Sequence, residues 1–151
     1  MAFAATEHQR LMDVRSSREI LKSVPMKSVS KFSVSLKFGD VFADGIHNID
    51  SHRIFIAEGL PFYRLRHVVY HESGHYASDN WITPRELNLY CSFYDQEAVS
   101  ASEYGEISCR ENFAEMFSYI LGSRHRMYWG NDDFLTRTDQ YKFIKKMVDD
   151  Q

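Results

Sequence analysis

The segment 61–77 constrains the fold most, because it combines a helical hydrophobic pattern with two histidines four residues apart. Its apolar residues recur at the spacing of one helix face. They are Leu65, Val68, Val69 and Tyr76. In a helix, His71 and His75 lie on one face about 6 Å apart. Both imidazoles can therefore reach one cation, provided that this face meets further ligands from elsewhere in the chain.

The two histidines belong to the motif His71-Glu72-Ser73-Gly74-His75, which has the form HExxH. Zinc binds imidazole nitrogen at about 2.0–2.1 Å in a tetrahedral site. Glu72 projects beside the pair, where it can accept a proton from water. The alternative interpretation is a solvated helix with two surface histidines.

A catalytic zinc needs a third protein ligand and an open fourth position. Glu111 and Glu115 are four residues apart in a predicted helix over 109–121, and burying two carboxylates without partners is costly. We rank Glu111 first as the third ligand, above His125, which follows the predicted helix end at Gly122. The alternative is a solvated helix surface that carries two glutamates.

His67 continues the spacing of four, but it cannot share one metal with both other histidines. Eight residues of helix rise about 12 Å, far more than two zinc bonds span. We therefore expect His67 to pair with a backbone group or a carboxylate.

The remaining patterns predict an α+β fold in a single domain over 1–151. We expect strands at 31–38, 46–50 and 53–56, with Asp44-Gly45 in a turn, and a C-terminal helix near 138–149. The predicted order is an N-terminal helix (1–25), a small three-stranded sheet (26–60), the HExxH helix (61–77), an irregular segment (78–108) with at most one short helix near 84–90, and the glutamate and C-terminal helices (109–151).

The composition of the chain argues against some classes of binding partner and cellular location. The net charge of −3 argues against nucleic acid, whose binders usually carry a basic face. No apolar run approaches the roughly 20 residues of a membrane helix, and no secretory signal is evident. Two cysteines predict no disulfide framework, so we expect a reducing cytoplasm, with Cys109 as a small buried hydrophobe rather than a thiolate cap on zinc. Nothing in the sequence indicates an oligomeric state.

These motifs resemble those of the gluzincin metallopeptidases, and most of all the anthrax-lethal-factor-like catalytic domains. HExGH is followed by Glu-x-Phe-Ala-Glu-x-Phe, which begins at Glu111, and Tyr104-Gly105 precedes Glu111 by seven residues. The resemblance covers about residues 53–121. It implies a zincin-like fold and a zinc-dependent endopeptidase that acts on a protein or peptide.

The resemblance also implies the site roles. His71, His75 and Glu111 would bind Zn²⁺, and Glu72 would be the general base. Tyr104 would stabilise the developing oxyanion, although other tyrosines are possible donors. Those tyrosines are Tyr90, Tyr94 and Tyr119. Glu115 would lie behind the ligands and hold one histidine in its tautomer.

Three further hypotheses stay open. Arg53, Ile54, Phe55 and Ile56 could form an edge strand that pairs with an extended substrate, or an ordinary core strand. The chain could instead be a metallopeptidase-like regulatory or binding module with weak or no catalysis. A DNA-associated zinc protease that uses His125 would need a basic surface, which the composition does not provide.

Overall fold

The computed structural model describes residues 7–24, 33–37, 45–48, 53–57, 59–124, 127 and 134–151. Its elements are, in chain order, α1 (Glu7–Lys22), β1 (Ser33–Lys37), β2 (Gly45–Asn48), β3 (Arg53–Ala57), α2 (Phe62–Asn80), α3 (Pro84–Glu97), η2 (Tyr104–Glu106), α4 (Cys109–Ile120), η3 (Leu135–Arg137) and α5 (Asp139–Asp149). The predicted α+β class is confirmed. Among the described residues, no helix is long and apolar enough to cross a membrane.

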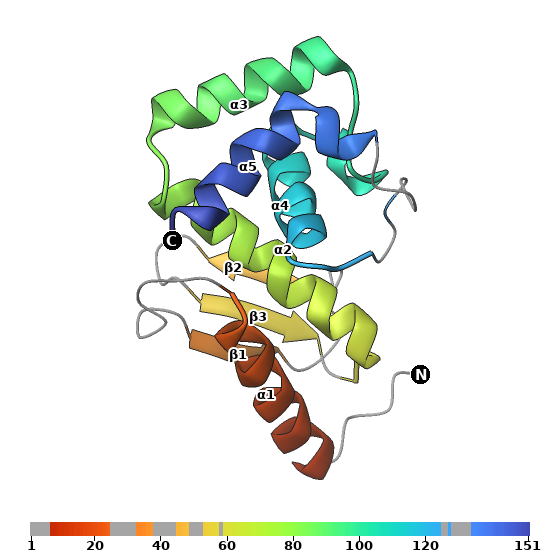
Figure 1. Ribbon diagram of the computed structural model, residues 1–151. Helices are drawn as coiled ribbons and strands as arrows, with labels where there is room; N and C mark the ends of the chain where they lie inside the picture. Colours follow the sequence, from red (N-terminus) through yellow and green to blue (C-terminus); the bar gives the residue numbers. More distant parts are fainter. Residues whose placement is uncertain are drawn as a thin grey trace.

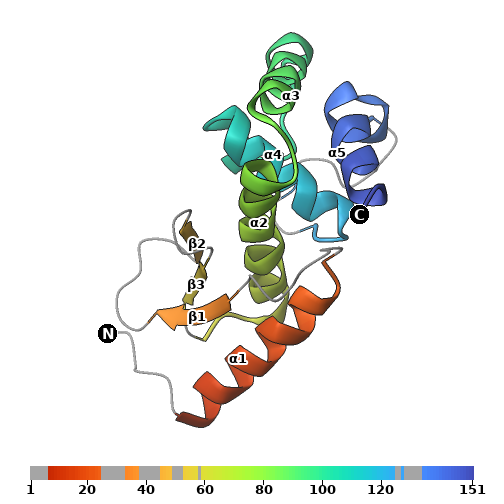
Figure 2. The ribbon, with the colours of Figure 1, turned by 90° about the vertical axis from the view of Figure 1, so that its left-hand side faces the viewer.

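Helix α2 is the central element of the structure. It runs between the sheet with α1 on one side and the group α3, α4 and α5 on the other (Figures 1 and 2). The predicted apolar face is buried, at Leu65, Val68, Val69 and Tyr76. The helix continues three residues beyond the predicted end because Ala77 and Ser78 are also buried, and it ends where the Trp81 N–H donates to the Ala77 carbonyl.

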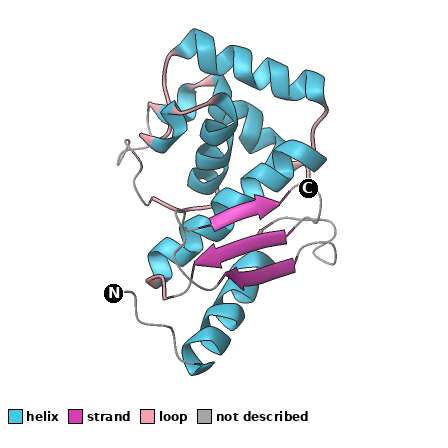
Figure 3. Ribbon diagram, turned by 180° about the vertical axis from the view of Figure 1, so that it is seen from behind, coloured by secondary structure: helices cyan, strands magenta, loops and turns pink. Residues whose placement is uncertain are grey.

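The sheet has the order β1-β3-β2, with β3 parallel to β1 and antiparallel to β2 (Figure 3). Ile54 and Ile56 of β3 are fully buried. Of the two hypotheses for Arg53–Ile56, the ordinary core strand is confirmed and the edge strand is wrong, since β3 has a partner on each side. Hydrophobic alternation specifies which face of a strand is buried but not which strands lie beside it. Gly45, predicted in a turn, is the first residue of β2.

The segment 78–108 is more helical than predicted, because the short helix expected near 84–90 begins at Pro84 as predicted but extends over the 14 residues of α3. Thr83 caps this helix. Its hydroxyl accepts from the Glu86 N–H at 3.2 Å, the Glu86 carboxylate accepts from the Thr83 N–H at 2.7 Å, and Pro84 occupies the first turn. Tyr90 is the one fully buried residue of α3, so the helix shows little of the apolar spacing by which a sequence predicts a helix. The capping box of Thr83 and Glu86 is the clearer sequence indication of this helix.

Helices α2 and α4 cross at backbone contact distance. A Cβ atom placed on Gly74 would lie 2.8 Å from the Cα of Ala114 and 3.1 Å from the Cβ of Phe117. Only glycine fits at this point of α2. Helix α4 ends close to its predicted end, and Gly122 follows with the left-handed φ of 104° expected of a C-cap glycine.

A disulfide joins Cys91 of α3 to Cys109, the first residue of α4. The two Cα atoms lie 5.4 Å apart. The prediction that Cys109 is a small buried hydrophobe is therefore wrong, and Cys109 offers no thiolate for a metal. Two cysteines far apart in a sequence carry no signal of whether the fold brings them together.

We predict that replacing both cysteines by serine lowers the free energy of unfolding by about 3 kcal/mol. The disulfide closes a segment of 18 residues, and the loss of chain entropy in the unfolded state scales with that length. Urea denaturation with and without a reductant measures the effect. The reductant should destabilise the wild type and leave the double variant unchanged, and an insensitive wild type would contradict the prediction.

We also predict that Gly74→Ala lowers stability, although alanine favours helices. The new methyl group meets the backbone of Ala114, which cannot rotate away, and such overpacking typically costs about 1–3 kcal/mol. The helix propensity of alanine returns about 1 kcal/mol. Urea denaturation should therefore show a net loss of up to about 2 kcal/mol, and a gain in stability would show that the two helices separate freely.

Candidate metal centre

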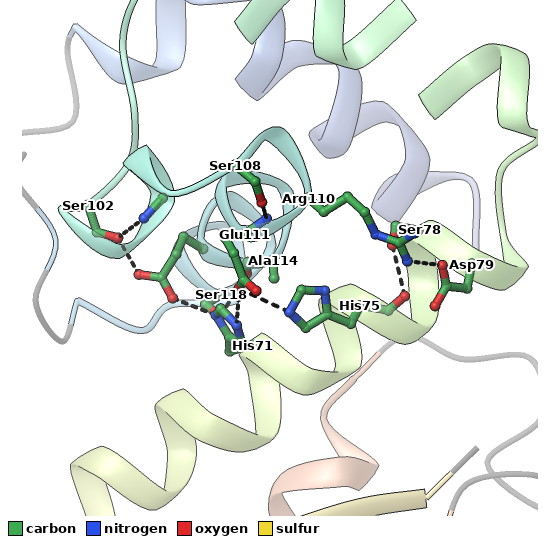
Figure 4. A network of polar contacts seen from close by, with 12 residues as sticks. His71, His75, Ser78, Asp79, Ser102, Ser108, Arg110, Glu111, Ala114 and Ser118 are labelled. Carbon is green, nitrogen blue, oxygen red and sulfur yellow. Dashed lines mark hydrogen bonds and ion pairs between the residues drawn. The ribbon is translucent and has the colours of Figure 1, made fainter. Parts of the chain in front are cut away.

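Helices α2 and α4 bring together three of the predicted metal ligands. The Oε2 atom of Glu111 lies 3.0 Å from Nε2 of His71 and 3.1 Å from Nε2 of His75. In Figure 4 the Glu111 carboxylate points from α4 toward both imidazoles of α2. Ser108 caps α4 by accepting from the Glu111 N–H at 3.2 Å, which fixes Glu111 in the first turn.

An ion pair beside the site ties the same two helices together. Arg110 of α4 contacts Asp79, which lies one helical turn beyond His75 on α2 (Figure 4). The neighbouring positions of Glu111 and His75 are therefore held by a contact outside the ligand set.

These three ligand atoms suit a tetrahedral metal. Two ligands about 2.0–2.1 Å from a tetrahedral zinc lie about 3.3 Å from each other, close to the observed 3.0 and 3.1 Å. The side chains of His71, His75 and Glu111 are 9, 17 and 23% exposed. The group is thus mostly buried, and Glu111 is the most exposed of the three ligands.

A second group of possible ligands lies deeper and shares His71. It consists of His67, His71 and Glu115, all buried. Oε1 of Glu115 lies 2.6 Å from Nδ1 of His71 and 2.9 Å from Nε2 of His67. The Ser102 hydroxyl donates to the other Glu115 oxygen at 2.5 Å, and Ser123 Oγ lies 2.9 Å from His67 Nδ1.

Both groups could hold a metal ion, and they differ in exposure. Glu115 is only 1% exposed, and its two oxygens contact His67, His71 and Ser102, whereas the Glu111 side chain is 23% exposed. The Glu115 contacts give His67 the expected carboxylate partner, and they orient the His71 ring with its Nε2 atom toward Glu111.

The two carboxylates make His71 strongly basic in the metal-free protein. Burial alone would lower the pKa of His71, but hydrogen bonds to Glu111 and Glu115 outweigh it and raise the pKa to about 10. Burial would raise the pKa of Glu111, but its hydrogen bonds to His71 and His75 lower it to about 2. The pKa of Glu115 is likewise lowered, because hydrogen bonds to His67 and His71 exceed the effect of burial.

Two further predicted site residues lie beside this group. Glu72 follows His71 on α2 and is 6% exposed, and its negative charge acts on both His71 and Tyr104. The Tyr104 ring centroid lies 5.5 Å from that of His71, and the tyrosine is 47% exposed. Burial and the negative charges of Glu111 and Glu72 raise the pKa of Tyr104, so its hydroxyl remains a donor at neutral pH.

The turn that carries Tyr104 is tied to the buried polar groups. The Gly105 N–H donates to the Ser102 hydroxyl at 3.1 Å, and the Tyr94 hydroxyl donates to the Gly105 carbonyl at 3.1 Å. Tyr94 is therefore engaged away from the ligands. Tyr90 is fully buried against Asn112, and Tyr119 is 2% exposed. Among the four candidate tyrosines, the structure brings Tyr104 to the site.

The sequence did not indicate two residues of this network, and one candidate ligand cannot be placed. Ser102 and Ser123 belong to no motif, since a serine hydroxyl that supports a carboxylate or a histidine has no characteristic spacing. His125, the competing third ligand, lies outside the described residues.

Comparisons of the chain with models of protein families, with curated proteins and with solved structures found no match. The resemblance to lethal-factor-like domains therefore rests on the motif residues, and membership of that family stays a prediction.

We predict that, in protein without bound metal, the stabilising contribution of His71 and Glu111 is largest between about pH 4.5 and 6.5. His71 has a raised pKa, so its contribution is complete below the ordinary 6.5 and is lost as the pH rises through about 10. Glu111 has a lowered pKa, so its contribution is complete above the ordinary 4.5 and is lost as the pH falls through about 2.

Urea denaturation in a chelator at a series of pH values measures this profile. Glu115→Gln should flatten the alkaline limb, because it removes one of the two carboxylates that hold the proton on His71. An identical alkaline limb in both proteins would contradict the assignment.

Proposed function

We propose that this chain is a zinc-dependent endopeptidase with a zincin-like arrangement of its helices and sheet. The observation that carries the proposal is the convergence of His71 and His75 from α2 with Glu111 from α4, at 3.0 and 3.1 Å. Glu72 and Tyr104 beside these ligands add a base and a hydroxyl donor. Peptide hydrolysis requires such a combination of groups.

The ligand chemistry favours zinc. Two imidazoles and one carboxylate form a catalytic zinc set, and a zinc site of this kind takes a water or substrate as its fourth ligand. When bound, Zn²⁺ acts as a Lewis acid and lowers the pKa of a bound water toward 7. His71 and His75 would hold the ion through Nε2, and Glu111 through a carboxylate oxygen.

The remaining steps belong to Glu72 and Tyr104. Glu72 accepts a proton from the attacking water and then delivers it to the leaving amine, so that the carboxylate is regenerated. The protonated Tyr104 hydroxyl donates to the oxyanion that develops on the substrate carbonyl. Glu115 holds the Nδ1 side of His71, which keeps Nε2 directed at the ion.

We propose β2, rather than the predicted β3, as the strand that binds an extended peptide. Among the described strands, β2 pairs with β3 alone, and it lies beside α2 near Glu72. A peptide added to this edge would lie close to the metal ligands. The substrate is thus a protein or peptide segment in extended conformation.

The disulfide bears on the cellular environment in which the proposed peptidase would act. Disulfides persist mainly in oxidising environments, so Cys91–Cys109 favours such an environment over the expected reducing cytoplasm. The net charge of −3 argues against nucleic acid as a partner.

The second candidate function is a binding or regulatory module that keeps the metal site. A stable, stoichiometric protein partner without a cleavage product would favour it. The complete set of Glu72, Tyr104 and the three ligands favours catalysis, because binding alone requires neither a base nor an oxyanion donor.

We predict that the wild type contains one zinc per chain and cleaves a peptide library in a chelator-sensitive manner. Glu72→Gln should retain zinc and lose at least about 100-fold in turnover, since general base catalysis contributes roughly 10²–10⁴-fold. Glu111→Gln should lower the zinc content as well. Asp95→Asn, an exposed carboxylate on α3, is the control. Full activity in Glu72→Gln would refute the mechanism.

A further inference from the structure

The edge strand β2 passes close to the face of α2 that carries Val68 and Glu72. A Cβ atom placed on Gly45 would lie 2.3 Å from Cγ1 of Val68, and 3.3 Å from both Cγ and Oε1 of Glu72. The first distance is a clash and the others are tight. The side chain of Glu72 therefore packs directly against the backbone of β2.

The register of the sheet agrees with this contact. Gly45 lies opposite Ile56 of β3, which is fully buried, and paired residues on neighbouring strands share one face of a sheet. Gly45 thus faces α2. Val68 and Glu72 are four residues apart, so they form one stripe of α2 that meets Gly45.

Lack of space for a side chain, rather than backbone conformation, explains why position 45 is a glycine. Among the described glycines, left-handed φ angles occur at Gly59 and Gly122 and not at Gly45. Glycine inside a strand weakens it and typically marks a place where another group approaches closely. At position 45 the approaching groups are the side chains of Val68 and Glu72.

We propose that Gly45 is a positioning residue for Glu72. Its bare backbone lets β2 pack on the Glu72 side chain, which fixes the carboxylate between the edge strand and the metal ligands. Any side chain at position 45 displaces this carboxylate from the water that it deprotonates. The inference rests on the proposed peptidase function, since it assigns Glu72 its role as base.

The decisive comparison is between Val68→Ala and the double variant Gly45→Ala/Val68→Ala. Removing the Val68 methyl groups relieves the severe overlap and allows β2 to keep its place. Of the three closest contacts of the new Cβ, the two that remain are with Cγ and Oε1 of Glu72 at 3.3 Å. Gly45→Ala alone is expected to combine both effects and to be less stable than either.

The double variant should match Val68→Ala in zinc content, urea midpoint and KM, but lose at least about threefold in kcat. A misplacement of about 1 Å can cost 10²-fold, so a shift of a few tenths of an ångström costs several-fold. Equal kcat values in the two proteins would overturn the proposal, because Gly45 would then act through packing alone.

A measurement without turnover separates this proposal from the proposed function. Crystal structures of zinc-loaded Val68→Ala and of the double variant should differ in the position of the Glu72 carboxylate. Superimposable carboxylates would overturn the positioning role. If the wild type cleaves no peptide while the carboxylates differ, the peptidase proposal fails and the contact between Gly45 and Glu72 stands.

Discussion

The close crossing of α2 and α4 is the constraint on which the site depends. The backbones meet at Gly74 and Ala114 so closely that a Cβ atom on Gly74 would lie 2.8 Å from the Cα of Ala114. At this close crossing a glutamate of α4 lies about 3 Å from two imidazoles of α2. The Arg110–Asp79 ion pair and the disulfide at Cys109 hold the start of α4 in the same place.

The buried charges explain why so many polar groups surround this crossing. Glu115 is almost fully buried, and an isolated carboxylate in that position would be strongly destabilising. Its oxygens instead accept from His67, His71 and Ser102. The same Ser102 hydroxyl accepts from the Gly105 N–H, so the group that satisfies Glu115 also anchors the turn of Tyr104. The buried network and the exposed tyrosine are thus one unit.

Features that depend on local periodicity and capping could be predicted from the sequence. The helices that carry His71 and Glu111 follow from apolar spacing, and α5 is preceded by its N-cap Thr138, whose hydroxyl accepts from the Tyr141 N–H as expected of a cap. Features that depend on long-range pairing could not be predicted. The central position of β3, the Cys91–Cys109 disulfide and the contact of Ser123 with His67 each join segments far apart in the chain, and no local pattern encodes them.

The geometry of one helix explains how a single short motif serves two sides of the molecule. Successive residues of a helix are rotated by about 100°, so His71 and His75 point nearly the same way while Glu72 points elsewhere. The histidine stripe faces α4 and its carboxylates, and the stripe of Val68 and Glu72 faces β2. Helix α2 therefore presents the candidate ligands to one layer and the proposed base to the other. In the proposed peptidase, a water between them would lie where the proposed substrate edge and the candidate ligands meet, so the relative position of the two layers would govern the proposed reaction.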